Sequence, residues 1–400
     1  MHGCYAIAAP GIEGVTAREL SGLGLTPAGT EPGGVSFTAG ARGLYAANLH
    51  LRTASRILVR VGSFHASAFH ELERRARRLA WQRFLLPGAV AEFRVTSRKS
   101  KLYHQDAIAE RLAAAVGRTA GRPDGQFASQ LFVVRLFHDE CTISADSSGE
   151  LLHRRGYRLE TAKAPFRETL AAAMLLESGW DGRAPLADPF CGSGTIPIEA
   201  ALLARGIPPG MARGFAFERW PELDAEAWGA VKADARSRVL ERAPGPILGA
   251  DRDPGAIAAA EANAARAGVA RDVTFRRATL SAFEPPAGGP GWLVTNPPYG
   301  IRVGEKAKLR GLFVRLGEVV RERCPGWRVA MLSPRRELEH ATGLGLESRW
   351  MTSNGGIRVR LVTTPAAPTG RAASPGSAPA APPAVAPRSS VPGPARTPAG

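Results

Sequence analysis

Apolar and polar positions alternate over the first 149 residues in a way that predicts two small α+β units. In residues 1–62, short apolar strands alternate with helical patterns. The predicted strands are 4–9, 34–39 and 55–62, and the predicted helices are 14–22 and 41–49. Residues 63–149 begin with a basic helical pattern and continue with strands at 91–96, 131–137 and 140–146 and a helix at 104–116. Both units therefore mix helices with short strands.

The pattern changes in residues 166–364, where short apolar strands are followed by helices. One strand ends at Asp188 and precedes a glycine-rich turn and a helix from Thr195, and later strands end at Asp251 and Asn296. This order predicts an α/β domain with a doubly wound, Rossmann-like sheet. Such sheets bind ligands at the carboxyl ends of their strands, so we expect Asp188, Asp251 and Asn296 to lie near one another.

The glycine-rich turn, LADPFCGSGT at 186–195, is typical of a nucleotide-type cofactor site. Gly192 and Gly194 let a ligand approach the backbone, and the start of the following helix adds a favourable field. A dinucleotide site would carry a third glycine, which is missing here, so the turn argues against a nicotinamide cofactor. The carboxylate of Asp251 can accept from both ribose hydroxyls of an adenosine-type ligand.

The tetrapeptide Asn296-Pro297-Pro298-Tyr299 is suited to methylating an exocyclic amino group of a nucleobase. The amide oxygen of Asn296 and the carbonyl of Pro297 can both accept hydrogen bonds from a flat NH2 group, and Tyr299 offers a ring for base stacking. The two prolines fix φ and keep the carbonyl aimed at the substrate. A strand-ending Asn-Pro turn without any function is the alternative. With the cofactor turn upstream, the pattern favours an S-adenosylmethionine-dependent amino-methyltransferase.

The net charge of +16 and the pI near 10.7 indicate a polyanionic partner. A compositional bias toward arginine is the alternative, so clustering matters more than the sum. A first basic cluster at Arg74–Arg78 fits a solvated helix face as well as it fits RNA. A second lies in FRVTSRKSKLYH at 93–104, expected in a loop between a strand and a helix, where Tyr103 and His104 could stack on bases. A third cluster lies in HRRGYR at 153–158.

Cysteines, histidines and apolar runs exclude several other classes of protein. The four cysteines are far apart, which favours reduced thiols in the cytoplasm and argues against zinc, and no metal is expected. Cys191 could be taken for a nucleophile, but methylation of an amino nitrogen needs none, so we expect it to pack. No apolar run is long enough for a membrane span. Residues 365–400 are rich in proline and alanine and should be disordered. Nothing indicates an oligomeric state.

Taken together, these motifs resemble the guanine-N2 RNA methyltransferases of the THUMP-containing group. The resemblance covers about residues 151–362 and is closest to the enzymes that modify guanosine in bacterial large-subunit ribosomal RNA. The matching runs are HRRGYR (153–158), APFRETLAAAMLLESGW (164–180), DPFCGSGTIPIEAA (188–201), an insertion at 206–242, GADRDP (249–254) and NPPYG (296–300).

The resemblance implies S-adenosylmethionine as cofactor and a role for each matching residue. Asp188 would lie near the methionine ammonium, Asp251 would hold the ribose, and Asn296 to Tyr299 would contact the base. The other implied cofactor-binding residues are Glu168, Thr169, Phe190, Gly192, Gly194, Thr195 and Thr279. Thr279 departs from the pattern, because the family has an aspartate there to accept from the adenine amino group, and a hydroxyl carries no charge.

The resemblance also implies a ferredoxin-like domain at 1–62, a THUMP RNA-binding domain at 63–149, a linker at 150–165 and a methyltransferase domain at 166–364. The RNA-binding residues implied or suggested by charge are Arg98, Lys99, Lys101, Arg154 and Arg155. The expected reaction is direct transfer to the N2 amino group of guanosine in ribosomal RNA. Transfer RNA as substrate, adenine-N6 methylation of DNA, and an inactive RNA-binding or assembly protein stay open as alternatives.

Overall fold

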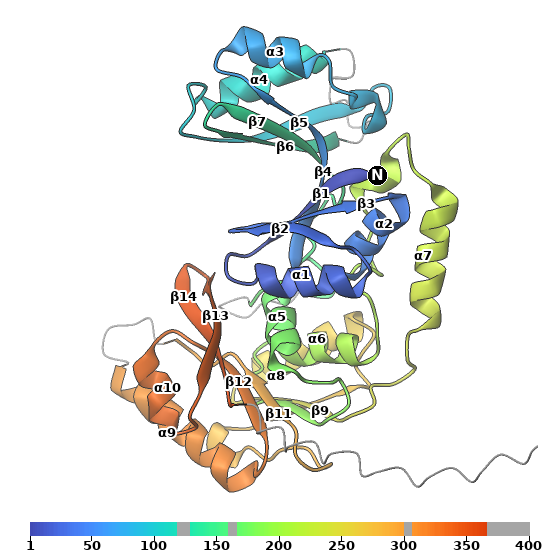
Figure 1. Cartoon of the computed structure of the whole chain (residues 1–400). Coiled ribbons are helices and arrows are strands. Elements are labelled where there is room, and N and C mark those ends of the chain that lie inside the picture. Colours follow the sequence, from blue (N-terminus) through green and yellow to red (C-terminus); the bar gives the residue numbers. More distant parts are fainter. Residues whose placement is uncertain (118–128, 159–165, 300–305, 366–400) are drawn as a thin grey trace, which may run out of the picture. The chain divides into compact units, whose positions relative to one another are not determined.

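The computed structural model describes residues 1–117, 129–158, 166–299 and 306–365 and contains two seven-stranded sheets (Figure 1). The tail predicted to be disordered lies, except for its first residue, outside the described residues. The second half of the predicted linker, 159–165, lies outside them too.

The first sheet is formed by the amino-terminal strands in the spatial order β2-β3-β1-β4-β7-β6-β5. All neighbours are antiparallel except β5 and β6. The strands are β1 (His2–Ala8), β2 (Pro27–Glu31), β3 (Gly34–Ala39), β4 (Ala54–His65), β5 (Val90–Arg98), β6 (Ser129–Phe137) and β7 (Glu140–Asp146). Strand β2 was not predicted, because nearly all of its side chains are exposed and it carries no apolar alternation.

Strand β4 joins the two predicted amino-terminal units into one sheet. It pairs with β1 through residues Ala54 to Val59 and with β7 through Leu58 to His65. The boundary expected between residues 62 and 63 therefore lies inside a strand. The helices of this region are α1 (Glu13–Gly22), α2 (Ala41–His50), α3 (Phe69–Ala76), η1 (Trp81–Arg83) and α4 (Gln105–Val116).

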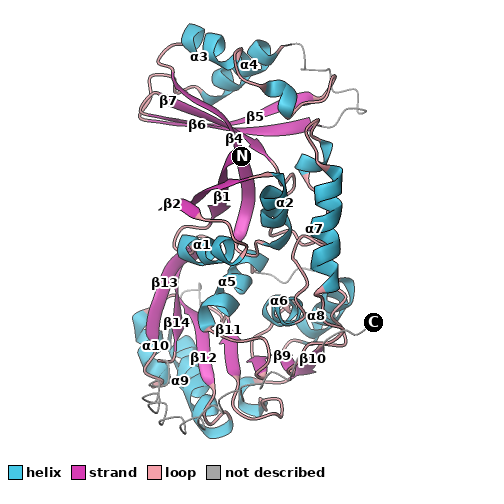
Figure 2. Cartoon of the chain, turned by 45° about the vertical axis from the view of Figure 1, so that its right-hand side comes forward, coloured by secondary structure: helices cyan, strands magenta, loops and turns pink. Residues whose placement is uncertain are grey.

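The second sheet has the order β10-β9-β8-β11-β12-β14-β13 and is covered by helices on both faces (Figure 2). All of its strands run in the same direction except β14. Its strands are β8 (Leu186–Asp188), β9 (Ile247–Asp251), β10 (Val273–Arg277), β11 (Trp292–Thr295), β12 (Arg328–Ser333), β13 (Glu347–Asn354) and β14 (Ile357–Thr363). The predicted α/β, Rossmann-like fold is confirmed.

Successive residues of the central strands enter two different cores, as expected of a doubly covered sheet. Leu186, Trp292 and Val294 pack with one set of helices, whereas Ala187 and Leu293 pack with the other. The first set is α5 (Glu168–Ser178), α6 (Thr195–Ala204) and α8 (Pro254–Arg266). The second is η3 (Leu280–Ala282), α9 (Lys306–Arg323) and α10 (Arg336–Thr342).

The buried aromatic residues of the insertion at 206–242 pack into the core of the first sheet, whereas Ile207 packs against the core of the second. The insertion contains η2 (Ala216–Arg219) and α7 (Ala225–Ser237). The ring of Phe217 stacks on that of Tyr45 with 4.6 Å between centroids. The indole Nε1 of Trp220 donates to Oε1 of Gln130 at 2.7 Å. The insertion thus joins the half of the chain that forms the second sheet to the amino-terminal sheet through aromatic and polar contacts.

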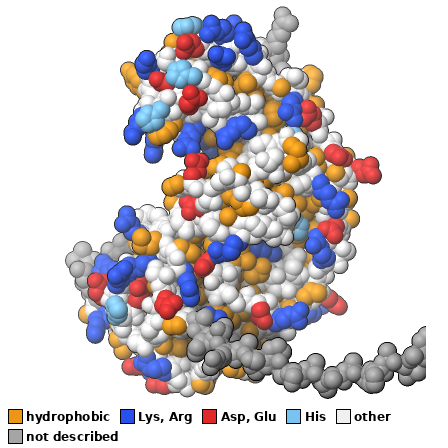
Figure 3. All heavy atoms as spheres, viewed as in Figure 1, with side chains coloured by type: hydrophobic (Ala, Val, Ile, Leu, Met, Phe, Trp, Pro, Cys, Tyr) orange, Lys and Arg blue, Asp and Glu red, His pale blue; other side chains and the backbone are white. Residues whose placement is uncertain are grey.

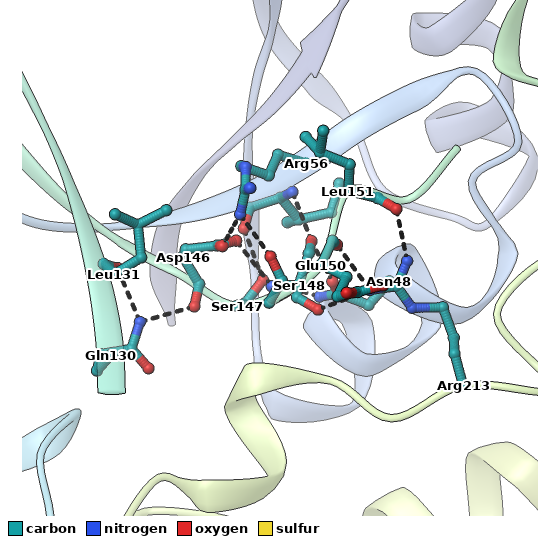
Figure 4. A network of polar contacts seen from close by, with 12 residues as sticks. Asn48, Arg56, Gln130, Leu131, Asp146, Ser147, Ser148, Glu150, Leu151 and Arg213 are labelled. Carbon is teal, nitrogen blue, oxygen red and sulfur yellow. Dashed lines mark hydrogen bonds and ion pairs between the residues drawn. The ribbon is translucent and has the colours of Figure 1, made fainter. Parts of the chain in front are cut away.

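A buried polar network completes this connection at the end of β7 (Figure 4). Asp146 is fully buried and pairs with Arg56, whose Nη1 also donates to the carbonyl of Gly149 at 2.7 Å. Arg213, from the insertion, donates to the carbonyls of Glu150 and Leu151 at 2.6 and 2.8 Å. The contacts to Gly149, Glu150 and Leu151 satisfy backbone carbonyls of the segment that follows β7. The segment that follows β7 is held in place by arginine side chains.

Candidate active site

Three neighbouring parallel strands bring the predicted chemical groups to one edge of the second sheet. Strand β8 pairs with β9 on one side and with β11 on the other, all in parallel. Their carboxyl ends therefore meet, and they carry Asp188, Asp251 and Asn296 respectively. Residues that lie more than a hundred positions apart in the chain form one site because of this topology.

Asp188 is buried and directly connects the glycine-rich turn with Thr295, the residue that precedes the NPPY segment. Its Oδ1 accepts from the hydroxyl of Thr295 at 2.5 Å and from the backbone N–H of Phe190 at 3.0 Å. Both contacts use Oδ1, which leaves Oδ2 available to a cationic ligand. Burial, with a smaller effect of the nearby Asp251 charge, raises the pKa of Asp188 to about 7. A ligand ammonium would stabilise the charged form.

Asp251 is held by two backbone donors, one on each carboxylate oxygen. Oδ2 accepts from the N–H of Gly192 and Oδ1 from that of Asp253, both at 3.0 Å. Each oxygen keeps a lone pair, so the carboxylate can accept from a vicinal diol. Asp253 has a different task, because its Oδ1 accepts from Gly255 N at 2.9 Å and caps α8.

The two glycines of the turn differ in how much space surrounds them. Both have positive φ, +53° at Gly192 and +84° at Gly194. A Cβ on Gly192 would meet nothing within 4 Å, so that position borders open space. A Cβ on Gly194 would lie 3.0 Å from Ala260 Cβ and 3.1 Å from Phe275 Cζ, so that glycine is required for packing.

A buried asparagine on α8 supports this turn. Asn263 of α8 donates from Nδ2 to the carbonyl of Ser193 at 3.0 Å. Its Oδ1 accepts from Arg266 at 2.6 Å, and Arg266 also donates to the carbonyl of Tyr157 at 2.9 Å. The turn is therefore linked to the HRRGYR segment. No pattern in the sequence indicated Asn263.

The NPPY segment begins directly after β11. Pro297 is buried and Pro298 is exposed. The hydroxyl of Tyr299 donates to Oδ1 of Asn296 at 2.5 Å and accepts from Nδ2 of Asn354 at 2.9 Å. Burial raises the pKa of Tyr299 to about 12, so the phenol keeps its proton at any physiological pH. Neither Thr295 nor Asn354 was singled out from the sequence, although Thr295 is adjacent to the motif.

The remaining predicted cofactor residues differ in burial and in their contacts. Glu168 is buried and pairs with Arg158 at 3.1 Å, and burial raises its pKa to about 7. Thr169 and Thr195 are buried. Phe190 is partly buried, and Thr279 is exposed, next to Ala278, whose N–H donates to the carbonyl of Asp251 at 2.9 Å. Thr279 thus lies beside the end of the strand that carries Asp251.

Cys191 lies within the turn but does not have the character of a nucleophile. It is buried, and burial raises the pKa of its thiol well above the usual range. The other three cysteines, Cys4, Cys141 and Cys324, are also free and buried. Across the described parts of the chain, no group of three or more His, Cys, Asp and Glu side chains is placed to hold a metal ion.

The second basic cluster is exposed at the end of β5. Arg98 is the last residue of that strand, and Lys99 and Lys101 follow it in a turn. The expected loop therefore holds the lysines only, because β5 continues two residues beyond the prediction. The rings of Tyr103 and His104 lie 4.2 Å apart, and Tyr103 is 66% exposed. Figure 3 shows many Lys and Arg side chains, with His among them, on this part of the face.

The prediction that Arg155 binds RNA is wrong. The side chain is buried, donates to the carbonyls of Leu152 and Arg52, both at 2.5 Å, and pairs with the buried Glu199 at 3.5 Å. No surface remains for a phosphate. Its neighbour Arg154 is exposed and pairs with Glu150 at 3.8 Å, so it stays available. A cluster of arginines in sequence can divide between core and surface.

A doubly wound sheet with one reversed strand, a glycine turn and carboxylates at neighbouring strand ends is typical of Rossmann-type domains that bind a nucleoside-containing ligand. Comparison with known proteins specifies the class further. The chain belongs to the family described as RMKL-like, methyltransferase domain, whose profile matches residues 155–360. A second profile, RlmL ferredoxin-like domain, matches residues 4–58.

Some relatives are about as long as this chain, and others are about twice as long. Protein slr0064 of Synechocystis sp., provisionally named an RNA methyltransferase, is 31% identical over 366 residues, which cover 90% of this chain and 95% of that protein. Ribosomal RNA large subunit methyltransferase K/L of Chromohalobacter salexigens is 34% identical over 382 residues, covering 90% of this chain and 52% of the relative. The chain spans about half the length of the K/L proteins that it matches.

Solved structures support the same assignment. SMU.472, provisionally described as a methyltransferase and crystallised with SAH, has a TM-score of 0.84 and 31% identity, covering 90% of this chain and 97% of that one. A Listeria monocytogenes protein named as a predicted N6-adenine-specific DNA methylase has a TM-score of 0.80 and 32% identity, with coverage of 90% and 95%. Among the helices that the structure describes, none is long and apolar enough to cross a membrane.

Proposed function

We propose that this protein transfers a methyl group from S-adenosylmethionine to the exocyclic N2 amino group of a guanosine in large-subunit ribosomal RNA. The observation that carries the proposal is the position of Asn296 and Pro297 at the sheet edge, one strand away from the carboxylate of Asp188 and two from that of Asp251. The names of the K/L relatives support ribosomal RNA as the substrate.

The geometry of the carboxylates fits the cofactor. The free Oδ2 of Asp188 would accept from the ammonium group, both oxygens of Asp251 would accept from the ribose hydroxyls, and the open side of Gly192 would leave room for the ligand. When bound, S-adenosylmethionine supplies an electrophilic methyl group on a sulfonium. SMU.472, crystallised with SAH, supports this assignment.

The protein's contribution to the reaction is to hold and orient the amine. The second lone pair of Asn296 Oδ1 and the carbonyl of Pro297 would accept both N–H groups of the guanine, which favours a tetrahedral, nucleophilic nitrogen. The partly buried ring of Tyr299 would border the flipped base. The thiol of Cys191 takes no part, because transfer to nitrogen is direct. Alignment of the two reactants supplies most of the acceleration.

We further infer that residues 63–149 form a THUMP domain that binds RNA next to a ferredoxin-like domain at 1–62, with a linker at 150–165 and a methyltransferase domain at 166–364. The exposed basic residues at the end of β5, with Tyr103 beside them, are the proposed contact surface. Arg154 is a further proposed contact. The shared strand β4 would make the two amino-terminal domains move as one body.

The test is methylation of defined RNAs with labelled S-adenosylmethionine. The 2-amino group of guanine lies on its pairing edge, so protein-free large-subunit RNA should be a better substrate than the mature subunit. Ribosomal RNA from a strain that lacks this gene should accept one methyl group per molecule, and nucleoside analysis should give N2-methylguanosine. Asn296→Ala should lower kcat at least about a hundredfold, with cofactor affinity retained.

Other outcomes would replace the proposal. Exclusive labelling of transfer RNA would change the substrate, and N6-methyladenosine in DNA would agree with the name of the Listeria neighbour. Cofactor binding without labelling of any nucleic acid would indicate an RNA-binding or assembly protein. Cys191→Ser serves as the matched control and should retain activity. A covalent RNA adduct that Cys191→Ser abolishes would refute direct transfer.

A further inference from the structure

Three side chains form a hydrogen-bonded chain that ends at the proposed base site. Asn354 donates from Nδ2 to the phenolic oxygen of Tyr299 at 2.9 Å, and the hydroxyl of Tyr299 donates to Asn296 Oδ1 at 2.5 Å. Asn296 and Tyr299 belong to the NPPY segment. Asn354 comes from the hairpin of β13 and β14 and was not among the predicted site residues.

The fold brings Asn354 to this edge and fixes its backbone. Strand β14 is antiparallel to both β12 and β13, so β13 is parallel to β12 and ends at the same edge as β11. Asn354 is the last residue of β13 and pairs with Ile357 across a two-residue turn. Gly355 and Gly356 have φ of +57° and +82°, as a type I′ turn requires. The amide of Asn354 is thus presented from a tight hairpin.

The chemistry of the three groups sets the direction of both hydrogen bonds. The lone pair of an amide nitrogen is delocalised into the carbonyl, so Nδ2 of Asn354 can only donate to Tyr299. The phenol has a single hydrogen, which is then committed to Asn296 Oδ1. That bond orients the amide of Asn296 with its oxygen toward the tyrosine and its second lone pair available. An amide turned the other way would present N–H groups to the substrate amine, and like donors repel.

We propose that Asn354 is a positioning residue for methyl transfer, which fixes the amide of Asn296 through the hydroxyl of Tyr299. The inference rests on the proposed function for its catalytic consequence, but the hydrogen-bonded chain itself can be tested without catalysis. It also gives Tyr299 a second role beside its ring, namely to relay the orientation.

The first experiment needs no activity, because the chain contains only four asparagines: Asn48, Asn263, Asn296 and Asn354. Protein labelled with 15N in asparagine should give four side-chain amide signals, assigned from single substitutions. Tyr299→Phe should shift the signals of Asn296 and Asn354 and leave the buried, separately bonded Asn48 and Asn263 unchanged. Unchanged signals of Asn296 and Asn354 would overturn the proposal whatever the protein methylates.

The second experiment measures turnover on the nucleic acid that the wild type modifies. Asn354→Asp keeps the shape but only accepts, so Tyr299 would donate to the new carboxylate and release Asn296. We expect kcat to fall about ten- to a hundredfold, with cofactor affinity, KM for RNA and melting temperature nearly unchanged. The exposed neighbour Ser353, replaced in Ser353→Ala, is the matched control and should behave as wild type.

A double-mutant cycle separates positioning from a merely structural role. Once Tyr299→Phe has removed the relay, Asn354→Asp should lower kcat by less than about twofold more. A full, multiplicative loss in the Tyr299→Phe background would overturn the proposal, as would an unchanged kcat in Asn354→Asp alone. A wild type without methyltransferase activity would refute the proposed function, and the amide signals would still decide whether the chain of contacts exists.

Discussion

Cofactor affinity should depend on pH through Asp188. The ordinary pKa of an aspartate, 3.8, is raised to about 7 here because the side chain is buried and lies near Asp251. The ionised carboxylate is the form that attracts an ammonium group. Affinity for S-adenosylmethionine should therefore rise as the pH rises through 7 and the carboxyl loses its proton.

The expected size of the effect follows from the fraction of Asp188 that is ionised. With a pKa of about 7, roughly a tenth is ionised at pH 6 and roughly nine-tenths at pH 8, so the dissociation constant should fall about tenfold. That change equals about 1.4 kcal/mol. Above about pH 8 the amino group of the cofactor loses its own proton, so affinity should decline again.

The stability of the cofactor-free protein should change with pH in the opposite direction to cofactor affinity. The folded protein holds a proton on Asp188 that the unfolded chain has already released above its ordinary pKa of 3.8. Between that pH and about 7 the free energy of unfolding of the cofactor-free protein should decrease as pH rises. Cofactor binding should offset the loss, because it favours the charged form in the folded state.

Calorimetric titration with S-adenosylmethionine at constant ionic strength, from pH 5.5 to 8.5, measures the effect. Asp188→Asn keeps an acceptor for Thr295 and Phe190 but carries no charge, so affinity should be weaker and flat below pH 7.5. Asp253→Asn is the control, because that carboxylate caps α8 and has no proposed contact with the cofactor, so the pH dependence should be retained. The reasoning is refuted if wild-type affinity is independent of pH, or if Asp188→Asn keeps the dependence.

Three further outcomes are expected. Asp251→Ala should weaken cofactor binding at least tenfold in the same assay, whereas Asp253→Ala should cost about 1 kcal/mol of stability as a lost helix cap; equal effects on affinity would show that the wrong carboxylate was assigned. Arg155→Met should lower the free energy of unfolding in urea by about 3 to 5 kcal/mol, since it strands the buried Glu199, while the exposed Arg154→Met should change little. In a variant that neutralises Arg98, Lys99 and Lys101, the slope of log RNA affinity against log salt concentration should flatten by about 0.7 for each lost contact.

Much of the candidate site could be predicted from the sequence, because its signals are local. A strand that ends in Asp188, a glycine turn and a helix start at Thr195 lie within ten residues, and NPPY follows its own strand directly. The order of these units predicts a doubly wound sheet, and the sheet predicts that their ends meet. The backbone of these segments has few alternative conformations, because the turn depends on glycines that accept positive φ and the prolines after Asn296 fix their own φ.

Contacts between distant segments could not be predicted in the same way. Asn354 reads as a hairpin residue before two glycines, and only the parallel course of β13 and β12 places it on Tyr299. Arg155 reads as one of three neighbouring arginines, and only the folded core shows that it pairs with Glu199.

The sequence by itself determined the type of fold, the chemistry of the strand ends and the basic character of the chain, since each depends on residues close together along the backbone. Only the tertiary structure decided that β4 continues through the expected domain boundary, that the insertion packs on the amino-terminal sheet, and which polar side chains are buried. The physical reason is that burial and hydrogen-bond pairing depend on which surfaces meet, and a polar residue has the same local pattern whether it faces water or a partner.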